Sequence, residues 1–148
     1  MTTEPTAPLP TEPGVGNATF VIDLLPADPP LDGTARFEFT KTWEGALTGT
    51  GRGVMLSAGD PSVGEAGYVA LEVVTGEVEG RLGTFVLQQL GTMTDGASTL
   101  TYAVVPGSGT GELATLAGSI EILVAEGVHQ VQFDYAFRAG GDAGVPAV

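Results

Sequence analysis

Glycine recurs at short intervals among β-forming residues between Gly76 and Leu113, and this pattern limits the fold more than any other feature. The segment begins G-E-V-E-G-R-L-G-T-F-V-L-Q-Q-L-G-T-M and later reads T-Y-A-V-V-P-G-S-G-T-G-E-L. Five of its glycines would each destabilise a helix by roughly 1 kcal/mol: Gly76, Gly80, Gly83, Gly91 and Gly96. Glycines in strands allow the sharp bends by which a sheet closes into a small barrel. The segment therefore predicts a curved, all-β structure.

Alternation of apolar and polar residues predicts strands along the rest of the chain. In residues 34–43, for example, one face carries Phe37, Phe39, Lys41 and Trp43. Eight strands are expected, at about 18–25, 34–43, 46–57, 67–74, 77–92, 98–105, 116–125 and 128–138. The turn before the fifth strand is placed at Thr75-Gly76, with a bend at the glycines that follow. Short loops favour antiparallel neighbours, and closure removes exposed edges. We therefore predict an eight-stranded antiparallel β-barrel.

The two ends of the chain differ in composition from the part between them. Residues 1–16 hold four prolines among Thr, Glu and Gly, which predicts a disordered leader, and 139–148 predict a flexible tail. Residues 17–138 are expected to form one barrel domain. No basic and apolar leader or long apolar run is present, so a cytoplasmic protein is expected.

Charge and composition narrow the classes of partner and site. The formal net charge is −13, from 18 acidic and 5 basic residues, which disfavours nucleic acid and anionic membrane surfaces. There is no cysteine, and His129 is the single histidine. Thiolate sites, cysteine catalysis and multi-histidine metal sites within one chain are excluded. The sequence predicts neither a metal nor a cofactor.

Several motifs together resemble the bacterial DUF3224 family. They are F-T-K-T-W-E-G (39–45), G-Y-V-A-L-E (67–72), V-T-G-E-V-E-G-R-L-G-T-F-V-L-Q-Q-L-G-T-M (74–93), V-V-P-G-S-G-T-G-E-L (104–113) and H-Q-V-Q-F-D-Y (129–135). The resemblance covers about residues 18–138 and implies a barrel like that of allene oxide cyclase, with no established activity. Relatives often carry His where this chain has Gln89. A homo-oligomer is plausible for the related fold, and fold alone does not fix function.

Three ionisable residues are candidates for acid–base chemistry. Lys41 and Glu72 lie on faces that alternation turns inward, where they would form a catalytic or ligand-orienting pair. The alternatives are a structural ion pair, or positions at strand ends in solvent. His129 is expected near a barrel mouth, where it could carry a proton, pack, or face solvent.

A ligand inside the barrel would contact aromatic and polar side chains on the inward faces. The candidates are Phe37, Phe39, Trp43, Tyr68, Arg81, Gln88, Phe133 and Tyr135, with Gln89 in place of Gln88 if the register shifts. Arg81 would bind a carboxylate, or else pair with Glu77 or Glu79. The segment P-G-S-G-T-G-E-L lacks the Lys-Ser/Thr of a phosphate-binding loop, so it predicts a glycine-shaped turn.

Three functions fit this sequence. The favoured one is a small barrel that binds an apolar or amphipathic small molecule in a cavity of a few hundred Å³. The second is an isomerase- or cyclase-like enzyme that uses an interior carboxylate. The third is an interaction protein with a filled barrel, in which exposed apolar stripes would mark a subunit interface.

Overall fold

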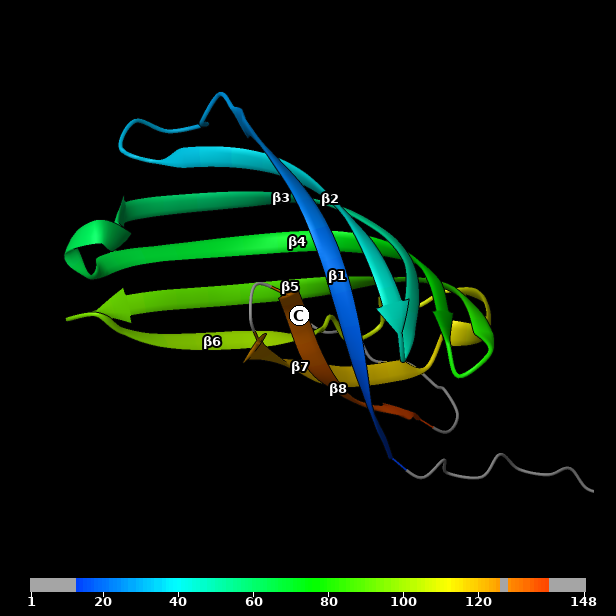
Figure 1. Cartoon of the computed structure of the whole chain (residues 1–148). Helices are drawn as coiled ribbons and strands as arrows, with labels where there is room; N and C mark the ends of the chain where they lie inside the picture. Colours follow the sequence, from blue (N-terminus) through cyan, green and yellow to red (C-terminus); the bar gives the residue numbers. More distant parts are fainter. Residues whose placement is uncertain (1–12, 126–127, 139–148) are drawn as a thin grey trace, which may run out of the picture.

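A computed structural model describes residues 13–125 and 128–138, and it confirms the eight-stranded antiparallel barrel (Figure 1). The strands are β1 (Gly14–Ala27), β2 (Ala35–Gly45), β3 (Leu47–Asp60), β4 (Glu65–Val78), β5 (Arg81–Thr94), β6 (Ala97–Val104), β7 (Leu116–Ala125) and β8 (Val128–Phe137). Two short 3-10 helices, η1 (Pro61–Val63) and η2 (Gly111–Leu113), lie in loops. Each strand pairs with the next along the chain, and β1 also pairs with β8. No helix of the described residues is long and apolar enough to cross a membrane.

The predicted alternation sets the orientation of each strand. In β2, Phe39, Lys41 and Trp43 are buried, whereas the residues between them are exposed. In a pleated strand successive side chains point to opposite faces. The inward set of β2 therefore continues across the sheet through the residues directly opposite, which are Gly53, Gly51 and Gly49 of β3.

The turn between β4 and β5 differs from the prediction. It lies at Glu79 and Gly80, both with positive φ (54° and 78°), and the predicted turn at Thr75-Gly76 is wrong. A two-residue turn with positive φ at both positions matches the twist of the paired strands, and X-Gly dipeptides favour it. Gly76 instead lies within β4, where an added Cβ would collide with the Thr48 carbonyl oxygen of β3. Consequently there is no long bent fifth strand over 77–92.

The start of the domain also differs. β1 begins at Gly14, inside the predicted leader of 1–16, because Gly14–Phe20 pair with Tyr135–His129 of β8. Gly14 fits there because the ring of Tyr135 occupies the space that a Cβ would need. The rest of that leader, and the predicted tail over 139–148, lie outside the described residues.

The barrel has two unlike halves, because its strands differ in length. β3, β4 and β5 have 14 residues each, whereas β7 and β8 have 10. β8 pairs with β1 only up to Phe20, and β6 pairs with β7 only at Ala103 and Ser119. In Figure 1, β2–β6 therefore run on to the left as a broad curved sheet beyond the β7–β8 hairpin. We name this part the open half and the rest the closed half.

Side chains fill the closed half. Its fully buried core includes Trp43, Leu47, Val74, Val78, Phe85, Leu87, Leu113, Val131 and Phe133. Phe20 packs on Trp43 with ring centroids 4.9 Å apart. Burial of each large apolar side chain contributes about 1.5–3 kcal/mol. This half therefore carries most of the hydrophobic stabilisation.

The segment P-G-S-G-T-G-E-L (106–113) closes the gap between β6 and β7. Side chains of this segment accept hydrogen bonds from the backbone N–H groups at the edge of β5 that β6 does not pair. Ser108 Oγ accepts from Val86 (3.0 Å), Thr110 Oγ1 from Thr84 (3.1 Å) and Glu112 Oε1 from Leu82 (2.9 Å). Gly83 is needed because an added Cβ would meet the Thr110 carbonyl oxygen. The segment thus protects the edge of β5, and this use agrees with the predicted glycine-shaped turn.

Candidate functional site

A buried polar cluster lies where the closed half meets the open half. Lys41 Nζ of β2 donates to Glu72 Oε1 of β4 (2.9 Å) and to the Tyr102 hydroxyl of β6 (3.0 Å). Trp43 Nε1 donates to the other carboxylate oxygen, Glu72 Oε2 (2.8 Å). The strands bring the four residues together because all four belong to the inward set of their strands.

Burial shapes the protonation of this cluster. The Lys41 side chain is surrounded by aromatic rings, with Nζ 4.2 Å from the Phe20 centroid and 5.2 Å from that of Trp43. Loss of solvent lowers the pKa of Lys41, and Glu72 offsets part of that shift by favouring the charged ammonium. Burial, reinforced by the negative Glu72, raises the pKa of Tyr102 far above its ordinary value. Tyr102 therefore stays a neutral phenol that accepts from Lys41.

The alternating glycines of β3 make room for the cluster. A Cβ at Gly51 would collide with the Glu72 carboxylate, and one at Gly53 would collide with the Phe39 ring and the Leu71 carbonyl oxygen. Close approach of a side chain to the backbone is a common reason for glycine within a strand. The glycines in the run G-T-G-R-G of β3 therefore leave the space that the side chains of the neighbouring strands β2 and β4 occupy.

The geometry of Lys41 and Glu72 corresponds to the structural alternative foreseen from the sequence. Lys41 is 4% exposed and Glu72 is 1% exposed, and both Glu72 oxygens accept hydrogen bonds from within the barrel. A general base needs an oxygen within reach of its substrate. This arrangement offers none, and the two residues form a buried ion pair at the centre of the barrel.

The open half encloses a cavity of about 560 Å³, which we name the cup. Cross-strand register places its wall residues on the inner face: Phe37 is opposite Met55, Ser57 opposite Tyr68, and Gly91 opposite both Tyr68 and Leu100. The inner wall comprises Ala35, Phe37, Met55, Ser57, Ala66, Tyr68, Gly91, Met93, Ser98 and Leu100. No strand of the described residues covers this face from the opposite side, since β7 and β8 end earlier. The wall is apolar, with hydroxyl groups as its polar side chains.

Tyr68 orders the floor of the cup. Its hydroxyl donates to Gln89 Oε1 (2.7 Å), and its ring lies across Gly91, where a Cβ would collide with it. Partial burial raises the pKa of Tyr68, so its hydroxyl stays protonated at neutral pH. The next inward layer holds Ala70 and Tyr102, which are buried beside Gln89. The cup therefore ends directly above the polar cluster.

The residues expected to line a ligand site do not form one group. Phe37 and Tyr68 lie in the cup wall, while Phe39 is buried beneath it. Trp43 and Phe133 belong to the packed core. Gln89 turns inward, and Gln88 is exposed on the outer face.

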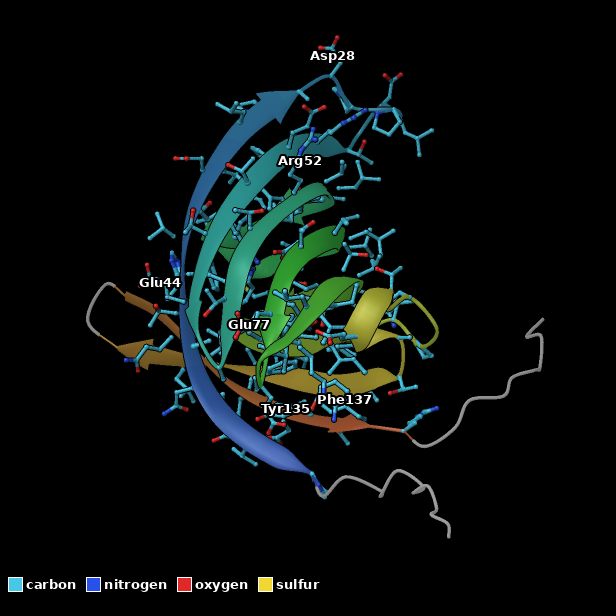
Figure 2. The ribbon with its side chains drawn as sticks, turned by 90° about the vertical axis from the view of Figure 1, so that its right-hand side faces the viewer. Asp28, Glu44, Arg52, Glu77, Tyr135 and Phe137 are labelled. Atoms are coloured by element: carbon cyan, nitrogen blue, oxygen red, sulfur yellow. The ribbon has the colours of Figure 1, made fainter. Side chains whose placement is uncertain are left out.

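Two other expected residues lie at the far end of the barrel. The Arg81 guanidinium stacks over the Phe137 ring at 3.8 Å, and the Tyr135 hydroxyl donates to Glu79 (2.7 Å). Figure 2 places Tyr135 and Phe137 together, at the opposite edge of the molecule from Asp28. Arg81 and Tyr135 therefore have no contact with the cup.

His129 lies on the inner face of β8, as the alternation predicts. Its ring stacks on Phe20 with centroids 4.7 Å apart and an interplanar angle of 4°. His129 thus packs on one ring, and the residue is otherwise exposed. Among the described residues no group of His, Cys, Asp and Glu could hold a metal ion.

Sequence reasoning missed Tyr102 of the cluster and eight of the ten wall residues of the cup, Met55, Met93 and Leu100 among them. The alternation in residues 98–104 contains the signal, because Ser98, Leu100, Tyr102 and Val104 share one face. For Met55 and Met93, alternation alone does not predict a place in the cup. Whether an inward side chain lines a cavity or joins the core depends on where the opposing strands end.

Comparison with known proteins identifies relatives of unknown function. The family model described as protein of unknown function DUF3224 matches residues 18–135. The chain is 39% identical to a DUF3224 protein of unknown function from Shewanella oneidensis MR-1, solved by crystallography, with a TM-score of 0.80. That match covers 86% of this chain and 98% of the other. No curated protein matches the chain. The likeness to allene oxide cyclase stays an implication of the sequence resemblance.

Proposed function

The chain belongs to the DUF3224 family, whose function is unknown, and we propose that it binds a small apolar or amphipathic molecule in the cup. The observation that carries the proposal is a 560 Å³ cavity whose wall combines Phe37, Met55 and Met93 with a few hydroxyl groups. Ligand sites are concave, mostly apolar and of about 300–1,000 Å³. The centre of the barrel is filled, so the ligand would lie in the open half and not beside Lys41.

Binding of the neutral fluorophore Nile red tests this proposal. We expect one molecule per chain, with fluorescence rising on binding. Met55→Trp should fill the cup and abolish binding, because Met55 is a wall residue. Its neighbour Leu56 is equally half-buried but faces outward, so Leu56→Trp is the matched control and should bind normally. Binding that survives Met55→Trp, or is lost only in Leu56→Trp, would place the ligand elsewhere.

The isomerase-like alternative gains less support. It requires an interior carboxylate that contacts the ligand, and Glu72 is closed off by Lys41, Trp43 and the floor of the cup. The cytoplasmic location, and the lack of nucleic-acid and membrane partners, stay predictions from composition.

The outer face supports a second candidate, self-association. Six apolar residues there adjoin one another across β3, β4 and β5: Val54, Leu56, Val69, Leu71, Val73 and Leu90. Leu71 is 57% exposed, and none of the six is charged. In a chain with a net charge of −13, two copies would repel least where both faces are uncharged. A second copy is therefore the partner that this face would accept.

Sedimentation velocity tests the second candidate. The wild-type chain should sediment as a dimer, and Leu71→Lys should sediment as a monomer because it would bury an unpaired charge. Val21→Lys adds the same charge at an exposed position of β1 and should leave the dimer intact. A monomeric wild-type chain would refute self-association without affecting the cup.

A further inference from the structure

Resting on the proposed function, we infer that the cup selects uncharged or cationic amphiphiles and rejects anions such as fatty carboxylates. The site is the cup itself, and its charge environment supplies the selectivity. Neither the wall of the cup nor the described loops around it contain a basic residue that points into the cup. Carboxylates surround its opening instead.

The wall of the cup holds no basic residue. Its polar side chains are the hydroxyl groups of Ser57, Tyr68 and Ser98. Hydroxyls hydrogen-bond neutral groups well, but a buried anion needs a positive partner to offset the loss of solvation. An amphiphile with a carboxylate head would therefore gain no ion pair inside.

The basic residues of the chain lie on the outer face, are buried in an ion pair, or are distant. Arg36, the nearest to the opening, lies on the outer face of β2 opposite Leu56, where it forms an ion pair with Glu38 (3.0 Å) while its Nε has no hydrogen-bond partner. Lys41 is buried against Glu72. Arg81 stacks on Phe137 at the far end. Arg52 lies on the outer face, and Arg138 follows β8 at the far end.

Every described connection at the opening carries a carboxylate. Asp28 and Asp32 lie in the β1–β2 loop, Asp60 and Glu65 flank η1, and Asp95 lies in the β5–β6 turn. The last three are adjacent in sequence to the cup: Asp60 lies between Gly59 and Pro61, Glu65 precedes Ala66, and Asp95 follows Met93 by two residues. A head group at the opening would therefore meet negative charge first.

Local hydrogen bonds keep these charges in place. Asp60 Oδ1 accepts from Ser62 N (2.9 Å) and Ser62 Oγ (2.7 Å), which lowers the pKa of Asp60 and keeps it ionised. Glu65 Oε2 accepts from the Asp95 N–H (2.9 Å) and ties the β5–β6 turn to β4. Asp60 and Glu65 are directly opposite in the ladder, an unfavourable placement for two like charges. Their proximity adds to the negative potential at this edge.

Displacement of Nile red by three ten-carbon ligands measures the selectivity. Decylamine, decanol and decanoate each have ten carbons in an unbranched chain and differ in charge. We expect decylamine and decanol to displace the dye at concentrations about tenfold lower than decanoate, at low salt. Added salt should narrow the gap between amine and carboxylate. Displacement by decanoate at concentrations equal to or below those of decylamine would overturn the inference and leave the proposed function intact.

Matched triple variants locate the source of the selectivity. Asp60→Asn, Glu65→Gln and Asp95→Asn together keep the hydrogen-bond acceptors but remove three charges at the opening, and should bring decanoate close to decylamine. Glu44→Gln, Glu77→Gln and Glu121→Gln remove three exposed charges elsewhere and should leave the gap largely unchanged. An equal effect of both triples would refute the role of the opening. Failure of Nile red to bind at all would refute the proposed function instead.

Discussion

The closed and open halves of this barrel are built from the same strands with the same alternation, yet only one of them is filled. In the closed half, inward side chains of β2–β5 meet those of β7, β8 and β1 and form the core. In the open half they meet no opposing strand, because β3–β5 are four residues longer than β7 and β8. Four residues correspond to about 13 Å of strand. Strand overlap, and not residue pattern, therefore decides which part becomes core and which becomes cavity.

The largest expected effect comes from the ion pair at the boundary of the two halves. Glu72→Ala leaves the Lys41 ammonium buried without its carboxylate and the Trp43 N–H without an acceptor. Breaking a buried pair by removing one partner costs about 3–5 kcal/mol. We expect this loss in the free energy of unfolding measured by urea denaturation.

A double-mutant cycle separates the pair from its surroundings. Lys41→Met combined with Glu72→Leu removes both charges and should cost less than the sum of the single changes. Glu77→Ala removes an exposed carboxylate of the same strand and should change stability by less than about 0.5 kcal/mol. A Glu72→Ala loss as small as that of Glu77→Ala would show that the pair does not stabilise the barrel.

The same glycine substitution in each half provides the next test. Gly53→Ala adds a Cβ against the Phe39 ring and the Leu71 carbonyl oxygen, neither of which can move freely in the core. Overpacking of this kind costs about 1–3 kcal/mol. At Gly91 the nearest atoms to an added Cβ belong to the Tyr68 ring, which can turn into the cup, so Gly91→Ala should cost less.

Thermal unfolding compares the two glycine variants, and Nile red affinity gives a second readout. Gly91→Ala should weaken dye binding because the displaced Tyr68 ring occupies the cup, whereas folded Gly53→Ala should bind normally. Equal destabilisation by both variants would contradict the contrast between a packed and an open half.

The sequence predicts the barrel and a cavity of a few hundred Å³, but not where in the barrel that cavity lies. Alternation over 34–43 and 67–74 places Lys41 and Glu72 on inward faces, and barrel closure is enough to make such residues neighbours. The turn at Glu79-Gly80 was not predicted, because Thr75-Gly76 offers the same X-Gly signal only four residues earlier. The position of the cup in the open half was not predicted either, because it depends on where β7 and β8 end relative to β5.

A smaller effect tests how the edge of β5 is protected in the closed half. Thr110→Ala removes the acceptor for the Thr84 N–H and the hydroxyl bonded to Thr84 Oγ1 (2.6 Å). We expect a loss of about 1 kcal/mol and faster amide exchange at Thr84.

Thr92→Ala is the matched control in the open half. It removes the exposed bond between Thr92 Oγ1 and Thr99 Oγ1 (2.6 Å), which serves no backbone group, and should cost less. Unchanged exchange at Thr84 in Thr110→Ala would show that the P-G-S-G-T-G-E-L segment does not protect the strand.

The smallest expected effect is the contribution of the three tyrosines to the pH dependence of stability. It is absent at neutral pH and appears only at alkaline pH. Burial raises the pKa values of all three tyrosines, Tyr68, Tyr102 and Tyr135, the last to about 12 with help from its bond to Glu79. The folded state therefore keeps protons that the unfolded chain loses near its ordinary tyrosine pKa of 10. Stability from these groups is complete below pH 10 and falls as the pH rises toward 12.

Lys41 contributes with the opposite sign, since its lowered pKa lets stability rise with pH, but that rise ends at its ordinary value of 10.5. The urea concentration at the midpoint of unfolding should therefore decline with rising pH once the lysine has titrated. In Tyr102→Phe and in Tyr135→Phe this decline should be shallower than in the wild-type chain. Phenolate absorbance of the folded chain should lag behind that of the urea-unfolded chain. Coincident titration curves would show that the tyrosines of both halves are as accessible as those of an unfolded chain, and would remove the distinction between a filled half and an open one.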